Sequence, residues 1–217
     1  MRNPPFIDAA MDSSLAAFGM LQADSMAAEP PSPVLASRRV AVLASDGLNE
    51  VQLDAVRRVL ESGGAQVNVV SNRAGPLWGE SGRQVPVDHH WLDMPSVMFD
   101  AVYVPGGIGS IAILQEDPDA RHFMREAYEQ GKSVAATGHG VELLREVGVP
   151  VPSRADEHTG NGIVTDLHGL ALEHVAEQFI AAIVKDRHWR RGGEDRNAAT
   201  SWSALPFNHG SEGSGPI

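Results

Sequence analysis

The segment Ser133–Leu144 constrains the fold of this chain more than any other part of the sequence. It begins with the small and apolar run Ser133–Thr137, passes through Gly138-His139-Gly140, and continues with the apolar residues of Val141–Leu144. This pattern predicts a buried strand, a sharp turn and a helix, the arrangement in which many α/β enzymes hold a nucleophile. Gly138 stands at the turn and has no side chain. The segment therefore predicts an active-site scaffold without its reacting atom.

The rest of the chain alternates in the same way. Short apolar runs, typical of strands buried on both faces, occur at Val40–Ala44, Val67–Ser71, Ala101–Val104 and Ser133–Thr137, with a further short strand at Ile163–Thr165. Helices are predicted between them, around Leu53–Leu60, after Asp117-Pro118, from about Val141 and over 170–188. Pro76–Trp78 and Gln84–Val87 predict a small β-hairpin. The fold class is therefore α/β, a three-layer α/β/α sandwich with a parallel sheet and a hairpin insertion.

The ends of the chain do not carry this pattern. Residues 1–37 are predicted to form an N-terminal extension, with a short helix around Leu15–Leu21 and a proline-rich linker over 27–37. Residues 38–191 form the predicted domain. Residues 192–217 are polar and rich in Gly, Ser and Asn, so they predict a disordered tail.

Composition narrows the classes of function. The net charge of −11 disfavours binding to nucleic acid or to anionic membrane surfaces. The absence of cysteine excludes disulfides, thiolate metal sites and cysteine nucleophiles. The first residues lack the pattern of a secretory signal, and no apolar run is long enough to span a membrane, so we expect a cytoplasmic location.

The loops that follow the parallel strands should meet at one edge of the sheet, where α/β proteins bind ligands. These loops are predicted at Ser45–Asn49, Pro105–Ser110 and Gly138–Gly140. Their candidate ligand-binding residues are Asp46, Gly106, Gly107, Gly109, Ser110 and His139. The glycine-rich loop lacks the Lys-Ser/Thr pair of a P-loop, and the acidic first loop disfavours FMN.

Two kinds of catalytic or metal site remain as less favoured alternatives. Ser45, Asp46 and His139 could form a hydrolase triad, although Ser45 lacks the usual elbow sequence. Metal binding could involve His89 with His90, or His168 with His174, but adjacent histidines on a strand face opposite ways, and a separation of six residues does not match one helical face. No metal site is therefore predicted. Trp189 and Trp202 could contact another subunit or their own domain.

Several ordered segments resemble the DJ-1/PfpI branch of the class I glutamine amidotransferase-like superfamily, and in particular the C-terminal flavodoxin-like domain of large-subunit catalases. The resemblance covers roughly residues 30–190. It rests on Arg39–Gly47, Met94–Gly107, Asp119–Tyr128, Ala135–Leu144 and Phe179–Trp189.

The resemblance has consequences for the site. Catalytic members of the branch use a cysteine at the elbow and a glutamate after the first strand. These positions correspond to Gly138 and to Asn49 or Glu50, so the resemblance implies a vestigial site with no catalytic residue. His139 stands where the related catalase domains tend to have glutamate.

The resemblance also implies a function. The chain would be a non-catalytic accessory domain that stabilises or assembles a haem catalase acting on hydrogen peroxide in oxidative stress. It would itself hold no cofactor, because haem would sit in the catalase, and its partners would be that haem domain or further copies of the chain. Two alternatives remain: an independent DJ-1/PfpI-like small-molecule hydrolase or binding protein, and a chaperone-like scaffold.

Overall fold

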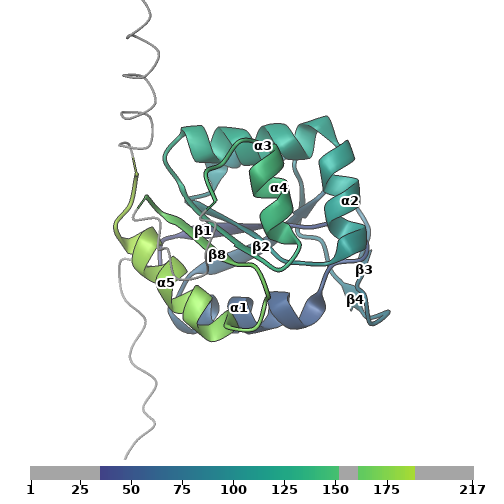
Figure 1. Cartoon of the computed structure of the whole chain (residues 1–217), viewed down its shortest axis with the longest axis horizontal. Coiled ribbons are helices and arrows are strands. Elements are labelled where there is room, and N and C mark those ends of the chain that lie inside the picture. Colours follow the sequence, from purple (N-terminus) through teal and green to yellow (C-terminus); the bar gives the residue numbers. More distant parts are fainter. Residues whose placement is uncertain (1–34, 152–160, 189–217) are drawn as a thin grey trace, which may run out of the picture. The chain divides into compact units, whose positions relative to one another are not determined.

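Six parallel strands form the central sheet of the domain. The computed structural model describes residues 35–151 and 161–188, shown in colour in Figure 1. The spatial order of the strands is β5-β2-β1-β6-β7-β8. Their bounds are β1 Arg39–Leu43, β2 Gln66–Ser71, β5 His89–His90, β6 Ala101–Val104, β7 Ser133–Thr137 and β8 Ile163–Asp166. The chain runs outward from β1 to β2 and β5 and then returns to β6 on the other side of β1. Such a reversal opens a crevice at the carboxyl ends of the strands.

Helices cover both faces of this sheet (Figure 1). Helices α1 (Glu50–Ser62) and α5 (Leu172–Val184) pack on one face, and α2 (Ile108–Glu116), α3 (Pro118–Glu129) and α4 (Gly140–Glu146) pack on the other. Alternate side chains of β1 enter the two cores, Val40 and Val42 on the α1 side and Ala41 and Leu43 on the α2 side. The predicted three-layer α/β/α sandwich with a parallel sheet is confirmed.

Side-chain caps fix where two of the helices begin. The Asn49 side chain accepts a hydrogen bond from the backbone N–H of Gln52 (3.0 Å) and so starts α1. The Asp117 side chain accepts from the backbone N–H groups of Asp119 and Ala120, and Pro118 occupies the first helical position of α3. Both caps satisfy N–H groups that a helix leaves without partners at its start.

The predicted hairpin is present beside the first loop. Strands β3 (Leu77–Trp78) and β4 (Gln84–Val85) pair antiparallel, with Leu77 opposite Val85. Backbone contacts tie the hairpin to the loop after β1: Gly47 N–H donates to the Trp78 carbonyl (2.6 Å), and Leu48 bridges to Gly79. A short 3-10 helix at Ser96–Met98 precedes β6.

The structure differs from the sequence expectation at one helix. Pro105–Ser110 is predicted as a loop, but the loop ends at Gly107, and Gly109 and Ser110 lie in the first turn of α2. Helix α2 is rich in apolar residues without a clear polar face, and its N-cap is Gly107, which offers no side-chain cap. The sequence therefore lacks both the amphipathic period and the capping signal that indicate a helix.

Smaller differences concern the ends of elements. Helix α5 ends at Val184, not near 188, and Asp186 adopts a positive φ of 64° beyond its end. Leu35, assigned to the linker by its sequence, is buried against Gly63 in the α1-side core. The expected helix at Leu15–Leu21, the linker before residue 35, both Trp189 and Trp202, and the tail lie outside the described residues. None of the helices in the described ranges has the length and apolar character needed to span a bilayer.

Candidate functional site

The strand–turn–helix segment forms the sharp elbow that its sequence predicts. β7 ends at Thr137, Gly138 adopts a φ of 52°, and α4 begins at Gly140. The Gly138 N–H donates to the Asp166 carbonyl on β8 (2.7 Å). At Gly140 a Cβ atom would overlap the Val104 carbonyl oxygen, so only glycine allows α4 to start this close to β6.

A side chain from α1, Gln52, lies directly beside the elbow. Its Oε1 atom accepts hydrogen bonds from the Gly106 N–H (2.8 Å) and from the Thr137 hydroxyl (2.7 Å). The Thr137 hydroxyl has one hydrogen, which it gives to Gln52, so the Tyr103 hydroxyl donates to Thr137 Oγ1 (2.8 Å). Burial raises the pKa of Tyr103 above its ordinary value, which keeps this phenol protonated as a donor. The network joins α1, β6 and β7 at the base of the elbow.

The hydrogen bonds also determine how the Gln52 amide is oriented. A backbone N–H can only donate, so the atom facing Gly106 is the amide oxygen and the NH₂ group faces the opposite way. That NH₂ group faces two glycines. A Cβ atom at Gly138 would lie 3.0 Å from Nε2, and one at Gly169 would overlap it. The amide therefore crowds the position from which a nucleophile at residue 138 would project.

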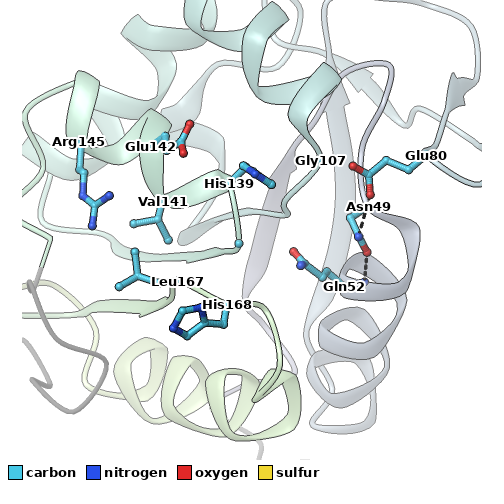
Figure 2. A pocket seen from close by; sticks show the side chains of 11 residues that line it. Asn49, Gln52, Glu80, Gly107, His139, Val141, Glu142, Arg145, Leu167 and His168 are labelled. Carbon is cyan, nitrogen blue, oxygen red and sulfur yellow. Dashed lines mark hydrogen bonds between the residues drawn. The ribbon is translucent and has the colours of Figure 1, made fainter.

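An open pocket of about 260 Å³ lies above the elbow. Figure 2 shows the side chains around it, which come from α1, the hairpin, α4 and the loop after β8. Most of the lining residues are polar or charged; they are Asn49, Gln52, Glu80, Gly107, Gly138, His139, Val141, Glu142, Arg145, Leu167 and His168. The elbow thus retains a cavity although it lacks a nucleophile.

The two expected acid positions do not point a carboxylate at the elbow. Asn49 lines the pocket and donates from Nδ2 to Glu80 (2.9 Å). Glu50 is only 4% exposed and accepts hydrogen bonds from the Ser81 N–H (3.1 Å) and hydroxyl (2.6 Å) of the hairpin. Burial by itself would raise the pKa of Glu50, but hydrogen bonds from Ser81 and from the backbone of Glu50 and Arg83 outweigh it and lower the pKa.

Gln52 is the site residue that the sequence interpretation missed. A signal for it exists, because Gln52 precedes Val56 by four positions and Leu60 by eight, which places a polar side chain on the buried stripe of α1. The resemblance to the DJ-1/PfpI branch implies Asn49 or Glu50 as the acid position. The packing of α1 on the sheet brings Gln52 to the elbow instead.

The remaining ligand-binding candidates divide into two groups. Gly107 and His139 line the pocket. The others hold the loops together. The Gly106 N–H donates to Gln52, and the buried Ser110 hydroxyl accepts from the Ser45 N–H (2.8 Å). Gly109 lies so close to Gly47 that a Cβ atom on Gly109 would be 3.3 Å from Gly47 Cα. Asp46 forms an ion pair with Arg73 and accepts from the Trp78 N–H (2.9 Å).

The alternative catalytic and metal sites are not assembled in the described part of the chain. No hydrogen bond there links Ser45, Asp46 and His139, and only His139 of the three lines the pocket. His90 uses both ring nitrogens, one toward the Asn72 carbonyl (3.0 Å) and one toward the Leu92 N–H (3.1 Å). No three His, Asp or Glu side chains within residues 35–151 and 161–188 cluster as metal ligands would.

Known proteins similar to this chain fall into two groups. Among curated proteins, it is 38% identical over 162 residues to Catalase HPII of Mycobacterium avium and 34% identical over 155 residues to Catalase-2 of Bacillus subtilis. These alignments cover 72% and 71% of this chain but 23% and 21% of the two catalases, so the chain spans about a fifth of their length. The expected resemblance to a domain of large catalases is confirmed.

Solved structures share the fold at lower identity. Oxidized Toxoplasma gondii DJ-1 has a TM-score of 0.62 and 18% identity, and the match covers 78% of this chain and 100% of that one. A two-domain Anabaena variabilis protein with DJ-1/ThiJ/PfpI-like and ferritin-like domains has a TM-score of 0.62 and 22% identity, over 78% and 56% of the two chains. Residues 38–189 match the family model described as DJ-1/PfpI family. With its flavodoxin-like sheet and its elbow at Gly138, the chain belongs to the DJ-1/PfpI family.

Proposed function

We propose that this domain is a non-catalytic accessory domain of a haem catalase, which it stabilises or helps to assemble. The observation that carries the proposal is the elbow, where Gly138 supplies no nucleophile and the Gln52 amide crowds the space for one. The similarity to stretches that make up about a fifth of two catalases supports a catalase as the partner. The reaction of that partner, as its name states, is that of a catalase.

The chemistry of the elbow residues supports a structural role. The sequence contains no cysteine, so no thiolate can attack a substrate. Gln52 stands beside the elbow where a general base would be useful, but an amide neither takes up nor releases a proton near neutral pH. Its hydrogen bonds instead join α1, β6 and β7. Such a network rigidifies the domain, which is useful for a scaffold.

The described residues do not fit haem. The elbow pocket of about 260 Å³ is lined mostly by polar and charged side chains, whereas cofactor pockets are mostly apolar and usually larger, roughly 300–1,000 Å³. In this proposal haem therefore belongs to the catalase partner, and no step of its chemistry passes through this domain.

A domain replacement in Bacillus subtilis Catalase-2 tests the proposal. Three catalases are compared: the intact enzyme, a version without the stretch that aligns with this chain, and a version in which residues 38–189 replace that stretch. We expect the deletion to shorten the half-life of catalase activity on heating or to disturb oligomer assembly. The replacement should restore both properties towards those of the intact enzyme.

A fourth catalase provides the control. It carries Toxoplasma gondii DJ-1 in the same place, which has the same fold at 18% identity to this chain. DJ-1 should restore less, because the proposed contacts depend on the surface and not on the fold. Failure of residues 38–189 to restore assembly or heat resistance would overturn the proposal, and equal restoration by DJ-1 would contradict a role specific to this surface.

One observation favours a second candidate function, that of an independent small-molecule hydrolase or binding protein. The pocket above the elbow is open, and His139 reaches it from the start of α4 (Figure 2). A screen with esters, glyoxals and peptides tests for turnover. Turnover that disappears in His139→Ala would favour an enzyme over the accessory domain. Absence of turnover in the parent chain would reject the hydrolase, and a binding protein would then have to be detected by ligand titration.

A further inference from the structure

The floor of the elbow pocket carries an unused hydrogen-bond donor. Gln52 is 9% exposed, and both of its fixed hydrogen bonds use the amide oxygen. No acceptor among the described residues receives a hydrogen bond from its NH₂ group, which faces Gly138 and Gly169 at the pocket. The NH₂ group opens on the pocket, so it can donate to a ligand that brings an oxygen acceptor.

Three further side chains that line the pocket, His139, His168 and Arg145, carry hydrogen-bond donors. His139 and His168 lie on either side of the elbow, and Arg145 lies farther along the same side of the pocket, beyond Val141 and Leu167 (Figure 2). Arg145 is exposed and forms no ion pair with any described residue. A guanidinium and an amide NH₂ that face one cavity are the groups that recognise a carboxylate.

The acidic residues of the pocket limit the charge of the ligand. Glu80 lies across the pocket from Arg145, where Asn49 holds it, and Glu142 also lines the cavity (Figure 2). The lining holds one guanidinium and two carboxylates, so a ligand carboxylate is favoured only on the side of Arg145, and a second negative charge would meet Glu80 or Glu142. A positive group on the ligand would instead be attracted to these two side chains.

We propose that the elbow pocket binds a small molecule with a single carboxylate, including zwitterions such as amino acids. One carboxylate oxygen accepts from Gln52 Nε2, the carboxylate faces His139 and His168, and Arg145 supplies the neutralising charge. The volume of about 260 Å³ fits a molecule of this size. This inference is independent of the accessory role and stands or falls separately from it.

Titrations followed by NMR test this site directly. The ¹⁵N-labelled chain is titrated at pH 7 with propionate, alanine, succinate and propylamine, and the side-chain NH₂ signals of Gln52 are followed. Propionate and alanine should shift these signals in a saturable way with dissociation constants in the millimolar range, on the order of 1–10 mM. Succinate should bind at least about tenfold more weakly, a difference of about 1.4 kcal/mol, and propylamine should leave the NH₂ signals unchanged.

Matched variants separate the site from the general charge of the protein. Gln52→Glu keeps an acceptor for Gly106 and Thr137 but removes the NH₂ donor, and Arg145→Gln removes the guanidinium. Both should weaken alanine binding at least about tenfold. Arg125→Gln removes an exposed arginine of α3 outside the pocket and should bind as the parent does. For the Gln52→Glu chain, the backbone signals of Gly138 and His139 report binding.

Three results would overturn the inference. The first is the absence of saturable shifts at Gln52 with either monocarboxylate up to about 50 mM, a concentration that would reveal any millimolar site. The second is equal affinity for propionate and succinate. The third is equal weakening by Arg125→Gln and Arg145→Gln, which would show an effect of net charge alone.

Discussion

At the scale of single residues, Gln52 makes the elbow a structural connection between α1, β6 and β7 instead of a reaction centre. Its side chain reaches from α1 to the ends of β6 and β7, where two donors bind one amide oxygen. The Tyr103 hydroxyl extends the network from the interior of the sheet. Networks of this kind are stable when all their members are paired and weak when one is missing. The stability of this connection should therefore be sensitive to the loss of the Gln52 amide oxygen.

Gln52→Leu tests that sensitivity. The leucine removes the acceptor of the Gly106 N–H and of the Thr137 hydroxyl, and leaves two buried donors unsatisfied. We expect a loss of about 3 kcal/mol in the free energy of unfolding, measured with urea. Gln66→Leu is the control, because Gln66 is exposed at the start of β2. A loss for Gln52→Leu no greater than that of the control would show that the network adds little stability.

Residue roles at this site were only partly accessible from the sequence. Gly138 could be placed at the elbow because the apolar run and the glycines define the turn locally. The partner of the elbow is Gln52 of α1, which lies 85 residues before Thr137 in the chain. Which residue of α1 reaches the elbow depends on the rotation of that helix on the sheet, which no local pattern gives. The resemblance therefore points to Asn49 or Glu50, and Gln52 is missed.

At the scale of elements, the loops after β1 and β6 fit together at two glycines. Gly107 adopts a φ of 120°, and a Cβ atom there would overlap the carbonyl oxygen of Gly47. The Asn49 N–H donates to the Gly106 carbonyl (2.8 Å) across the same contact. The close approach positions the starts of α1 and α2, and with them one side of the pocket.

Gly107→Ala should separate these two loops. The substitution combines a backbone conformation that L residues rarely adopt with a steric overlap, so we expect a loss of about 3 kcal/mol or more in unfolding free energy. The control is Gly75→Ala, where the added methyl group would contact nothing within 4 Å. Denaturation midpoints compare the two variants, and similar midpoints would contradict the importance of the contact.

The hairpin depends on Glu50 in a way that should vary with pH. Burial would raise the pKa of Glu50 above its ordinary value of 4.5, but hydrogen bonds from Ser81 and from the backbone of Glu50 and Arg83 outweigh it, so the pKa is lowered in the folded domain. A carboxyl group with a lowered pKa stabilises the fold above its unfolded pKa, and this stabilisation is lost as the pH falls through the folded value. The relevant range therefore lies below about pH 4.5.

Glu50→Gln should lower the unfolding free energy by about 1–2 kcal/mol at pH 7. The difference from the parent chain should shrink as the pH falls below 4.5, because protonated Glu50 then resembles glutamine. Urea denaturation at several pH values measures this difference. Glu129→Gln, at an exposed position of α3, is expected to show no such trend. A difference that stays constant down to pH 3 would contradict the proposed role of the Glu50 charge.

Elements were predictable where their sequence signal is local. Five strands of the sheet and helices α1, α3 and α5 carry apolar runs, apolar periods or caps that can be read directly. Strand β5 is missed, because His89–His90 is two residues long and polar. Helix α2 has neither, since it is apolar without a polar face and begins at a glycine. Its formation depends on the core between the sheet, α3 and α4, where Ile111 and Leu114 are buried, and this tertiary packing is invisible to a local pattern.

At the scale of the whole molecule, the two ends of the parallel strands carry different features. The pocket lies at the carboxyl ends of the strands, and a buried lysine lies at their amino ends, just before β7. Lys132 is 0% exposed and donates to the Ser96 carbonyl, while Ser96 donates to Glu126 (2.5 Å). Burial, followed by repulsion from Arg187, lowers the pKa of Lys132 to about 8, against the opposing effects of Glu126 and Asp100.

This pKa predicts how global stability changes in alkaline solution. Between pH 8 and 10.5 the unfolded chain keeps a proton on Lys132 that the folded domain has begun to release. Stability rises with pH wherever the unfolded state binds more protons, so Lys132 should make the domain more stable over this range. Tyr103 acts in the opposite sense above about pH 10, because its raised pKa keeps the folded phenol protonated after the unfolded one has ionised.

Lys132→Met isolates this effect between pH 8 and 10. The free energy of unfolding of the parent chain, relative to that of the variant, should rise with pH by at most roughly 1.4 kcal/mol per unit, the limit for one proton. The sequence contains a single other lysine, Lys185, which is exposed, so Lys185→Met is a matched control and should keep the slope of the parent. Parallel slopes for the parent and Lys132→Met would show that Lys132 keeps an ordinary pKa in the fold, which would require water or a carboxylate to reach its ammonium group at the amino ends of the strands.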